Sequence, residues 1–564
     1  MRGLHKRMTT LQGEYVQNFE RARTRFFAVV MFFTLAFVIV SGRLVYLMGP
    51  GILAGKNVEV IKTVNTAPAP KRNNIVDRNG MLLATSLSTR SLYADPKLVT
   101  NPEELATSLV KIFPELSREK LIEELSAKKR RFTWIKRHIS PKQYAAVLEI
   151  GEPALNVKGE YRRFYPQGAL LSHIIGFTNI DGLGIAGLEK QYDSELRNDE
   201  RPIQLTIDLA LQDSLHENLQ DIIKRFQAIG GSGIVMDVKN GEILAMTSLP
   251  DFDPHDYANA NDNAMFNRNT TGVYEMGSTF KTFAVAAALE NKATKFSKTY
   301  DVREPLKYGR FRINDYHPFK RLITMPEVFI HSSNIGTAQM ALDLGGDKLK
   351  AFYQDLGFFD RPAIDLPERS KPLVPNPWRE ISTVTTSYGH GIAVTPLHVA
   401  RATAAMVNGG TLPNPHLMDQ TDPDAPQVQV ISPETSNIIA GLMALTVEKG
   451  TGSKAAHADM WVGGKTGTSE KTSASGGYAK KKLLSSFVGV FPADQPRYVI
   501  LVTVDEPKGQ KESWGYATGG WTAAPVAQKT IQYMKTAFAD LYEVDKAAFP
   551  ALQSLESYVK EDDE

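Results

Sequence analysis

The chain of 564 residues contains no cysteine. Disulfide bonds, thiolate metal ligands and a cysteine nucleophile are therefore excluded. An excess of charge of one sign is also lacking, because 65 lysines and arginines stand against 62 aspartates and glutamates, and this balance gives no indication of a nucleic-acid partner. Hydrophobic residues make up 42% of the chain, as in globular proteins, and the length predicts about three or four structural units.

One long uncharged run lies near the N-terminus, at residues 26–42 (FFAVVMFFTLAFVIVSG), and apolar residues continue beyond Arg43. A membrane-spanning helix needs about 20 apolar residues, so the sequence predicts a retained anchor over 26–48 in which Arg43 reaches the far interface. Basic residues dominate 1–25, which places that tail in the cytoplasm and the bulk of the chain across the membrane. The alternative is a cleaved signal peptide, but no A-x-A site follows the run closely.

Apolar runs separated by turn residues predict the strands. Residues 75–86 (IVDRNGMLLATS) and 233–248 (GIVMDVKNGEILAMTS) each read as a hairpin around Asn-Gly. The runs LLSSFVGVFP and RYVILVTVDEP predict neighbouring antiparallel strands. Residues 101–150 are charged with helical spacing, and we expect solvated amphipathic helices there. The chain closes with SYVKEDDE, an acidic tail that we expect to be disordered.

Two glycine-rich stretches imitate nucleotide-binding motifs. GGKTGTS (463–469) ends like a phosphate-binding loop, but Asp459 stands where that motif requires its first glycine. Residues 182–187 (GLGIAG) match the dinucleotide fingerprint, yet a hairpin follows where a nucleotide-binding sheet needs a crossover helix. We therefore interpret GLGIAG as a turn that joins two domains. In GGKTGTS we expect Lys465 to bind an anion other than phosphate.

A lysine in an unfavourable position indicates the chemistry. Residues 274–290 (YEMGSTFKTFAVAAALE) predict a buried helix, yet Lys281 lies in its first turn, near the positive end of the helix dipole. Burying an ammonium there costs on the order of 1 kcal/mol or more, and a local conflict of this kind indicates function. Because residues i and i+3 share a helix face, the Lys281 amine can reach the Ser278 hydroxyl and accept its proton. The alternative is that Ser278 only caps the helix.

Two further motifs accompany this one. Ser332-Ser333-Asn334 and Lys465-Thr466-Gly467 follow in the order S-x-x-K, S-x-N, K-T-G, the three signatures of penicillin-interacting serine enzymes. With these motifs the chain resembles the class B penicillin-binding proteins, the monofunctional peptidoglycan transpeptidases, and among them the division type (FtsI-like). Further stretches that resemble the family are DRNG, GLEKQYD, LTIDLALQ, YGHGIAVTPL and GGWTAAPV. Met276 stands where the family often has proline.

The resemblance implies a multidomain α+β chain with a single transmembrane helix, a mixed α/β pedestal domain and a C-terminal penicillin-binding, serine β-lactamase-like domain with an antiparallel sheet flanked by helices. The expected divisions are a cytoplasmic tail 1–25, the anchor 26–48, the pedestal or dimerisation-like domain 49–225, the transpeptidase domain 226–540 and the acidic tail 541–564.

By position, the resemblance also implies the roles of five side chains. Ser278 would be the acylated nucleophile and Lys281 its base. Ser332 would relay a proton to the leaving amine, and Asn334 would orient Lys281 and the substrate amide. Lys465, on an edge strand, would polarise Ser332 and attract the terminal carboxylate of the substrate.

Three neighbouring residues would complete the substrate site. Thr466 and Thr468 would offer hydroxyls to the carboxylate, and Gly467 would leave room for the substrate backbone to pair as an added strand. The backbone N–H groups of Ser278 and Thr468 would form the oxyanion hole. The resemblance implies no metal and no organic cofactor.

The implied substrates are peptidoglycan stem peptides ending in D-Ala-D-Ala, which β-lactam antibiotics imitate. The implied setting is the bacterial inner membrane, with the catalytic domain in the periplasm, beside a SEDS-family glycosyltransferase and other division proteins at the septum. An elongation-type transpeptidase, a membrane-anchored β-lactamase or carboxypeptidase, and a β-lactam sensor stay as alternatives. A class A lactamase would carry E-x-x-x-N between Asn334 and Lys465, where the chain has none, and a sensor would need an output domain before Phe26.

Overall fold

The computed structural model describes residues 25–43, 71–198, 201–309, 311–418, 428–472, 477–538 and 549–560. The chain divides into two units, Met1–Ala67 and Pro68–Glu564. In the first unit the described part is one helix, Arg25–Arg43, which is exposed and is long and apolar enough to cross a membrane. The predicted anchor extends to Met48, and its last five residues, like the predicted tail before Arg25, lie outside the described residues.

The second unit begins with a five-stranded sheet, here called the N-terminal sheet. Four of its strands lie in the order β3-β2-β1-β5, and the fifth strand, β4, also pairs with β2. Its strands are β1 (Ile75–Val76), β2 (Leu82–Ala94), β3 (Thr133–Ile139), β4 (Leu155–Phe164) and β5 (Ile203–Gln204). The strands β1 and β2 form the predicted hairpin around Asn79-Gly80. Three helices supply the apolar side chains that cover one end of β2 and β4: α2 (Pro102–Ile112), α3 (Arg118–Ser126) and α4 (Pro141–Ile150).

Local sequence explains these helices. Asn101, Ser117 and Ser140 each accept a hydrogen bond from a backbone N–H of the first turn, and prolines open α2 and α4. The expectation that 101–150 is helical throughout is wrong for β3, which lies between α3 and α4. Lysine and arginine occupy half-buried positions of that strand. Because of these charges the sequence does not show the alternation of a strand, although Thr133, Ile135 and Ile139 are buried.

Short helices connect this region to the rest: α5 (Ser172–Ile175), α6 (Gly187–Gln191) and α7 (Asp193–Asn198). The GLGIAG stretch is a tight turn before α6, as predicted. A Cβ on Gly184 would lie 1.8 Å from the Glu189 carbonyl oxygen, and one on Gly187 would lie 2.5 Å from the Gly176 nitrogen. These glycines therefore serve the close approach of two chain segments.

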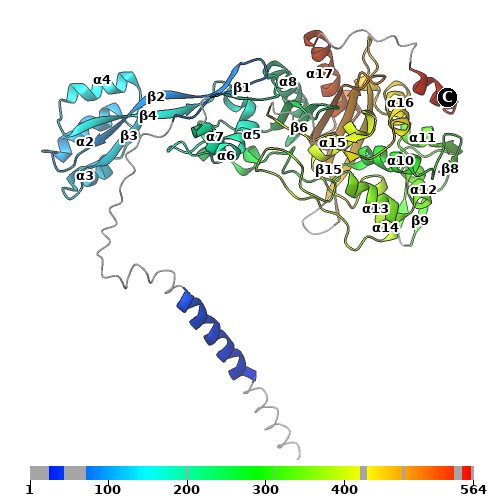
Figure 1. The fold of residues 1–564 in the computed structure, drawn as a ribbon, viewed down its shortest axis with the longest axis horizontal. Helices are drawn as coiled ribbons and strands as arrows, with labels where there is room; N and C mark the ends of the chain where they lie inside the picture. The colour runs from blue at the N-terminus through cyan, green and yellow to red at the C-terminus, as the bar shows by residue number, and fades with distance from the viewer. Residues whose placement is uncertain are drawn as a thin grey trace, which may run out of the picture. The chain divides into compact units, whose positions relative to one another are not determined.

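The C-terminal sheet is antiparallel, in the order β14-β15-β16-β6-β7. Its strands are β6 (Gly230–Asp237), β7 (Ile243–Leu249), β14 (Gly463–Thr472), β15 (Tyr478–Phe491) and β16 (Tyr498–Asp505). Both predicted strand pairs, β6–β7 and β15–β16, are present. Side chains of the sheet alternate between two cores, one shared with α8 (Leu209–Arg225) and α17 (Ala523–Ala537), the other with helices between β7 and β14. Figure 1 shows α8 and α17 near one another beside this sheet. The predicted antiparallel sheet flanked by helices is confirmed.

The helices that follow β7 build the second core. They are α9 (Asp262–Met265), α10 (Lys281–Glu290), α11 (Met325–Ile330), α12 (Asn334–Leu344), α13 (Gly346–Asp355), α14 (Glu380–Ser387), α15 (Pro396–Val407) and α16 (Pro433–Lys449). Three short strand pairs lie among them, β8 (Thr299–Asp301) with β11 (Leu322–Thr324), β9 (Leu306–Tyr308) with β10 (Phe311–Ile313), and β12 (Thr411–Leu412) with β13 (Val428–Gln429).

The C-terminal segment is ordered as far as residue 560, so the expected disorder of SYVKEDDE (557–564) is wrong for residues 557–560. Residues Pro550–Glu556 form α18, and Leu552 and Leu555 are buried against α16. Beyond the helix, the Lys560 N–H donates to Glu327 Oε1 at 3.1 Å. The prediction considered only the charge of the tail, whereas apolar side chains three residues apart give this segment a face that packs. Residues 561–564 lie outside the described residues.

Candidate active site

The nucleophile candidate lies in a tight turn that leads into a buried helix. Ser278 is half-buried in the 3-10 turn Gly277–Phe280, directly before α10. Neither the turn nor α10 has a side-chain cap, so the alternative in which Ser278 is an N-cap is wrong. Gly277 has φ +54°, and a Cβ there would lie 2.9 Å from the Thr468 carbonyl oxygen. The turn thus lies against β14.

Lys281 is fully buried at the start of α10. Its Nζ donates to Ser332 Oγ at 3.1 Å and also to the Ser332 carbonyl oxygen. Among the hydrogen bonds of the described residues there is none between Lys281 and Ser278, although the i, i+3 spacing predicts one. Burial lowers the pKa of Lys281 well below its usual value, the charge of Lys465 lowers it further, and Asp315 opposes the shift.

Lys465 approaches the same hydroxyl from β14. It is also fully buried, and its Nζ donates to Ser332 Oγ at 2.9 Å. Burial lowers the pKa of Lys465 to about 7. Because two amines occupy the acceptor positions of the Ser332 oxygen, its own proton must point elsewhere. Ser332 also has φ +62°, a left-handed conformation that is rare outside glycine and is common at functional sites.

Asp315, which belongs to none of the three motifs, accepts hydrogen bonds from the residues that directly follow Ser332. Asp315 Oδ1 accepts from the Asn334 N–H at 2.5 Å and the Ile335 N–H at 3.0 Å, and its Oδ2 accepts from Ser333 Oγ at 2.6 Å. A carboxylate at this place satisfies the first N–H groups of α12 and lies at the positive end of that helix. No periodicity or spacing indicated Asp315, because its partners lie about twenty residues further along the chain.

Asn334 is placed differently from its expected role. Its Nδ2 donates to the Asn314 carbonyl oxygen at 2.9 Å, and Lys281 is not among its described partners. The side chain still lines the same cleft as Ser278 and Ser332. In this structure Asn334 therefore borders the cleft, and its side-chain amide is bonded to the backbone of Asn314.

The cleft has a volume of about 440 Å³ and brings most of the predicted residues together. Ser278, Ser332 and Asn334 line one part of it, and β14 lines another through Thr466, Gly467 and Thr468. Lys281 and Lys465 lie beneath, reaching it through Ser332. Side chains that the motifs do not include complete the lining: Tyr316, His317, His331, His390, Thr451, Ser469, Glu470, Leu483 and Thr518.

β14 is an edge strand of the C-terminal sheet, as predicted for Lys465. Thr466 Oγ1 lies 2.7 Å from Thr451 Oγ1, and Thr468 Oγ1 accepts from the Gly519 N–H at 3.2 Å. The reason for Gly467 differs from the expected one, since a Cβ there would lie 2.4 Å from Ser486 Oγ and 2.7 Å from the Met276 carbonyl oxygen. A glycine is therefore required so that the turn that carries Ser278 can pack on β14.

Two family models match the chain, the penicillin binding protein transpeptidase domain over residues 231–532 and the penicillin-binding protein dimerisation domain over residues 67–210. The chain belongs to the penicillin-binding protein transpeptidase family. It is a penicillin-binding D,D-transpeptidase of the class B, FtsI type.

Similar proteins cover most of the chain. The probable peptidoglycan D,D-transpeptidase FtsI of Caulobacter vibrioides is 37% identical over an alignment of 529 residues that covers 90% of this chain and 88% of that protein. Stage V sporulation protein D of Bacillus subtilis is 32% identical over 89% of this chain and 84% of that protein. The crystal structure of penicillin binding protein 3 from Mycobacterium tuberculosis with ampicillin has a TM-score of 0.68 at 22% identity, covers 86% of this chain and 98% of that one, and supports the fold.

Proposed function

We propose that this transpeptidase cross-links peptidoglycan stem peptides through a serine acyl-enzyme, with Ser278 as the nucleophile. One observation carries the proposal: the Ser332 hydroxyl, in the cleft that Ser278 lines, accepts hydrogen bonds from two buried lysines. Burial lowers the pKa of Lys281 and so favours its neutral amine, which can accept the proton of a serine.

In the proposed reaction, Lys281 takes the Ser278 proton as Ser278 Oγ attacks the carbonyl carbon of the penultimate D-alanine. The resulting oxyanion accepts from the N–H groups of Ser278 and Thr468, whose segments are in contact. The proton then passes from Lys281 through Ser332 to the leaving nitrogen, and D-alanine departs. An amine of a neighbouring stem peptide attacks the acyl-enzyme, forms the new amide bond and restores Ser278. A β-lactam would form the same ester and would stay attached.

We propose that the terminal carboxylate of the substrate lies against β14, near Lys465 and between the hydroxyls of Thr466 and Thr468. Both hydroxyls line the cleft. Each also has a partner within the protein, Thr451 or Gly519, and these partners hold the hydroxyls in place before substrate arrives.

A fluorescent penicillin tests the mechanism. We expect wild-type protein to be labelled covalently, Ser278→Ala to take no label, and Lys281→Ala to react at least about a hundredfold more slowly, as is typical for loss of a general base. Ser88→Ala, on an exposed position of β2, is the matched control and should label like wild type. Label that survives Ser278→Ala would refute the assignment, and label that is lost within minutes would favour a β-lactamase.

We further propose the setting of this activity. The relatives named FtsI support a role in division, and the helix Arg25–Arg43 supports a single N-terminal anchor with the catalytic domain in the periplasm. The proposed partners are a SEDS-family glycosyltransferase and other division proteins. The proposed domain boundary lies between residues 225 and 226.

Depletion of the protein in cells tests the proposed role in division and should give filamentous cells. Round cells would favour the elongation type instead.

A further inference from the structure

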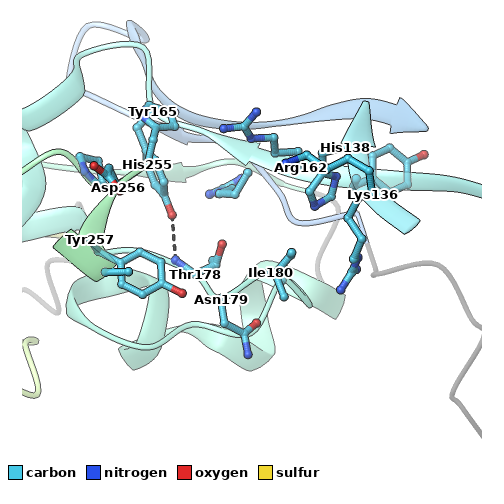
Figure 2. Close-up of a pocket in the computed structure, with 16 residues that line it drawn as sticks. Lys136, His138, Arg162, Tyr165, Thr178, Asn179, Ile180, His255, Asp256 and Tyr257 are labelled. Atoms are coloured by element: carbon cyan, nitrogen blue, oxygen red, sulfur yellow. Dashed lines mark hydrogen bonds between the residues drawn. The ribbon is translucent and has the colours of Figure 1, made fainter. Parts of the chain in front are cut away.

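A second cleft, of about 410 Å³, lies beside the N-terminal sheet and has no part in the proposed reaction. Its walls come from β3, from β4, from the loop 178–182 and from the segment 254–258 that follows β7. Figure 2 shows His138 and Arg162 on the strand side, across from Thr178 to Ile180, with Tyr165 and Tyr257 towards the other end. The cleft thus joins the N-terminal sheet to the segment that leads into the transpeptidase helices.

A β-bulge between β2 and β3 sets the conformation of His138 on β3. Arg90 of β2 pairs with Ile139 and Leu92 pairs with Lys136, so the register between them is irregular. Within this bulge His138 has φ +55°, a conformation that is rare for a residue other than glycine. Its N–H donates to Ser91 Oγ at 3.0 Å, and its Nδ1 lies 2.9 Å from Thr89 Oγ1. Bulges re-aim side chains and are frequent next to functional sites.

The arginines of this cleft differ in their pairing. Arg137 is neutralised by Glu160 at 2.9 Å and Asp181 at 2.6 Å. Arg162 is exposed and has neither an ion pair nor a side-chain hydrogen bond among the described residues. Its neighbour Arg163 is paired with Glu189, but its buried Nη2 has no acceptor in the described part of the chain. A buried donor without an acceptor is costly.

The cleft adjoins a larger one of about 920 Å³, since both are lined by His138, Arg162 and His255. The larger cleft contains a second arginine without a carboxylate partner among the described residues, Arg90, whose guanidinium lies 4.7 Å above the Tyr144 ring. We call the two clefts together the strand trough. Two unneutralised arginines at separate places along it match an extended ligand with more than one negative charge better than a single ion.

We propose that the strand trough binds an extended peptide segment with acidic side chains, presented by a partner protein, with its carboxylates on Arg162 and Arg90. Charge complementarity identifies the ligand class, and charge-assisted bonds to arginine are the strong ones. The inference stands independently of the acyl-enzyme mechanism, because no residue of the trough lines the active-site cleft.

The test uses the full-length protein in detergent at low ionic strength, where surface electrostatics are least screened. Fluorescence anisotropy follows a labelled ten-residue peptide of alternating Glu and Ala, and a second peptide with Gln in place of Glu. We expect the Glu peptide to bind at least tenfold more tightly than the Gln peptide. Arg162→Glu and Arg90→Glu should each weaken it at least tenfold. Arg130→Glu, an equal charge change at an exposed position outside the trough, should leave it unchanged.

Equal binding of the two peptides, or an equal loss in Arg130→Glu, would overturn the proposal. Inorganic pyrophosphate is the third probe. If it binds and depends on Arg162 while the Glu peptide does not bind, the trough takes a small anion and the peptide proposal fails. Labelling by fluorescent penicillin should be the same in all three variants, which shows that the transpeptidase domain of each is folded, and the circular dichroism spectrum and melting temperature should also match wild type.

Discussion

Removal of the Lys465 charge should change the pH dependence of acylation. Lys281 must be neutral to accept the Ser278 proton, so the rate falls as pH drops through the pKa of Lys281. Lys465 lowers that pKa while it carries its own proton, and its pKa is about 7. In Lys465→Gln the pKa of Lys281 should rise, and the acid limb of the rate profile should move to higher pH.

The geometry sets the size of the shift. Both Nζ atoms bond to Ser332 Oγ, at 3.1 and 2.9 Å, so the two nitrogens are at most about 6 Å apart. With an effective dielectric constant of about 20, two unit charges at that separation repel by about 3 kcal/mol. Removal of a repulsion of that size should move the acid limb to higher pH by an amount that a pH profile resolves.

Stopped-flow labelling with a fluorescent penicillin from pH 4 to 9 would measure this shift. Lys471→Gln is the matched control, because Lys471 is also on β14 but pairs with Asp505 and Glu506. An acid limb that stays in place in Lys465→Gln, or that moves downward, would refute Lys281 as the titrating base. A shift of equal size in Lys471→Gln would show that the effect is not local.

Three further outcomes follow from particular contacts. Asp315→Asn removes the charge that opposes the shift of Lys281, so the acid limb should move to lower pH, opposite to Lys465→Gln. Gly389→Ala should slow penicillin labelling at least about tenfold, because its Cβ would lie 2.1 Å from the Gly277 carbonyl oxygen and displace the nucleophile turn. Leu555→Asp should release α18 and speed amide exchange of 550–556 by at least about tenfold, as the loss of a buried leucine predicts, whereas exposed Ser554→Asp should not.

Local features could be predicted from the sequence because they depend on neighbouring residues. The hairpin of β6 and β7 follows from an Asn-Gly turn between two apolar runs, and the buried helix α10 follows from an uncharged run. The bond from Lys281 to Ser332 could not be predicted in this way, since it joins residues 51 positions apart. Helix spacing favoured Ser278 as the partner, but helix spacing says nothing about side chains from another element that compete for the same amine.

The K-T-G motif shows how the structure can add a packing reason that a short stretch does not reveal. A glycine after lysine and threonine suggests space for a ligand, either a phosphate or a substrate backbone. In the structure the space beside Gly467 is taken by Ser486 and by the turn that carries Ser278. A Cβ on Gly277 would lie 2.9 Å from the Thr468 carbonyl oxygen, and one on Gly389 would lie 2.1 Å from the Gly277 carbonyl oxygen. Three glycines distant in sequence thus let three backbone segments meet without side chains, and this contact, more than any single motif, sets where Ser278 lies relative to Lys465.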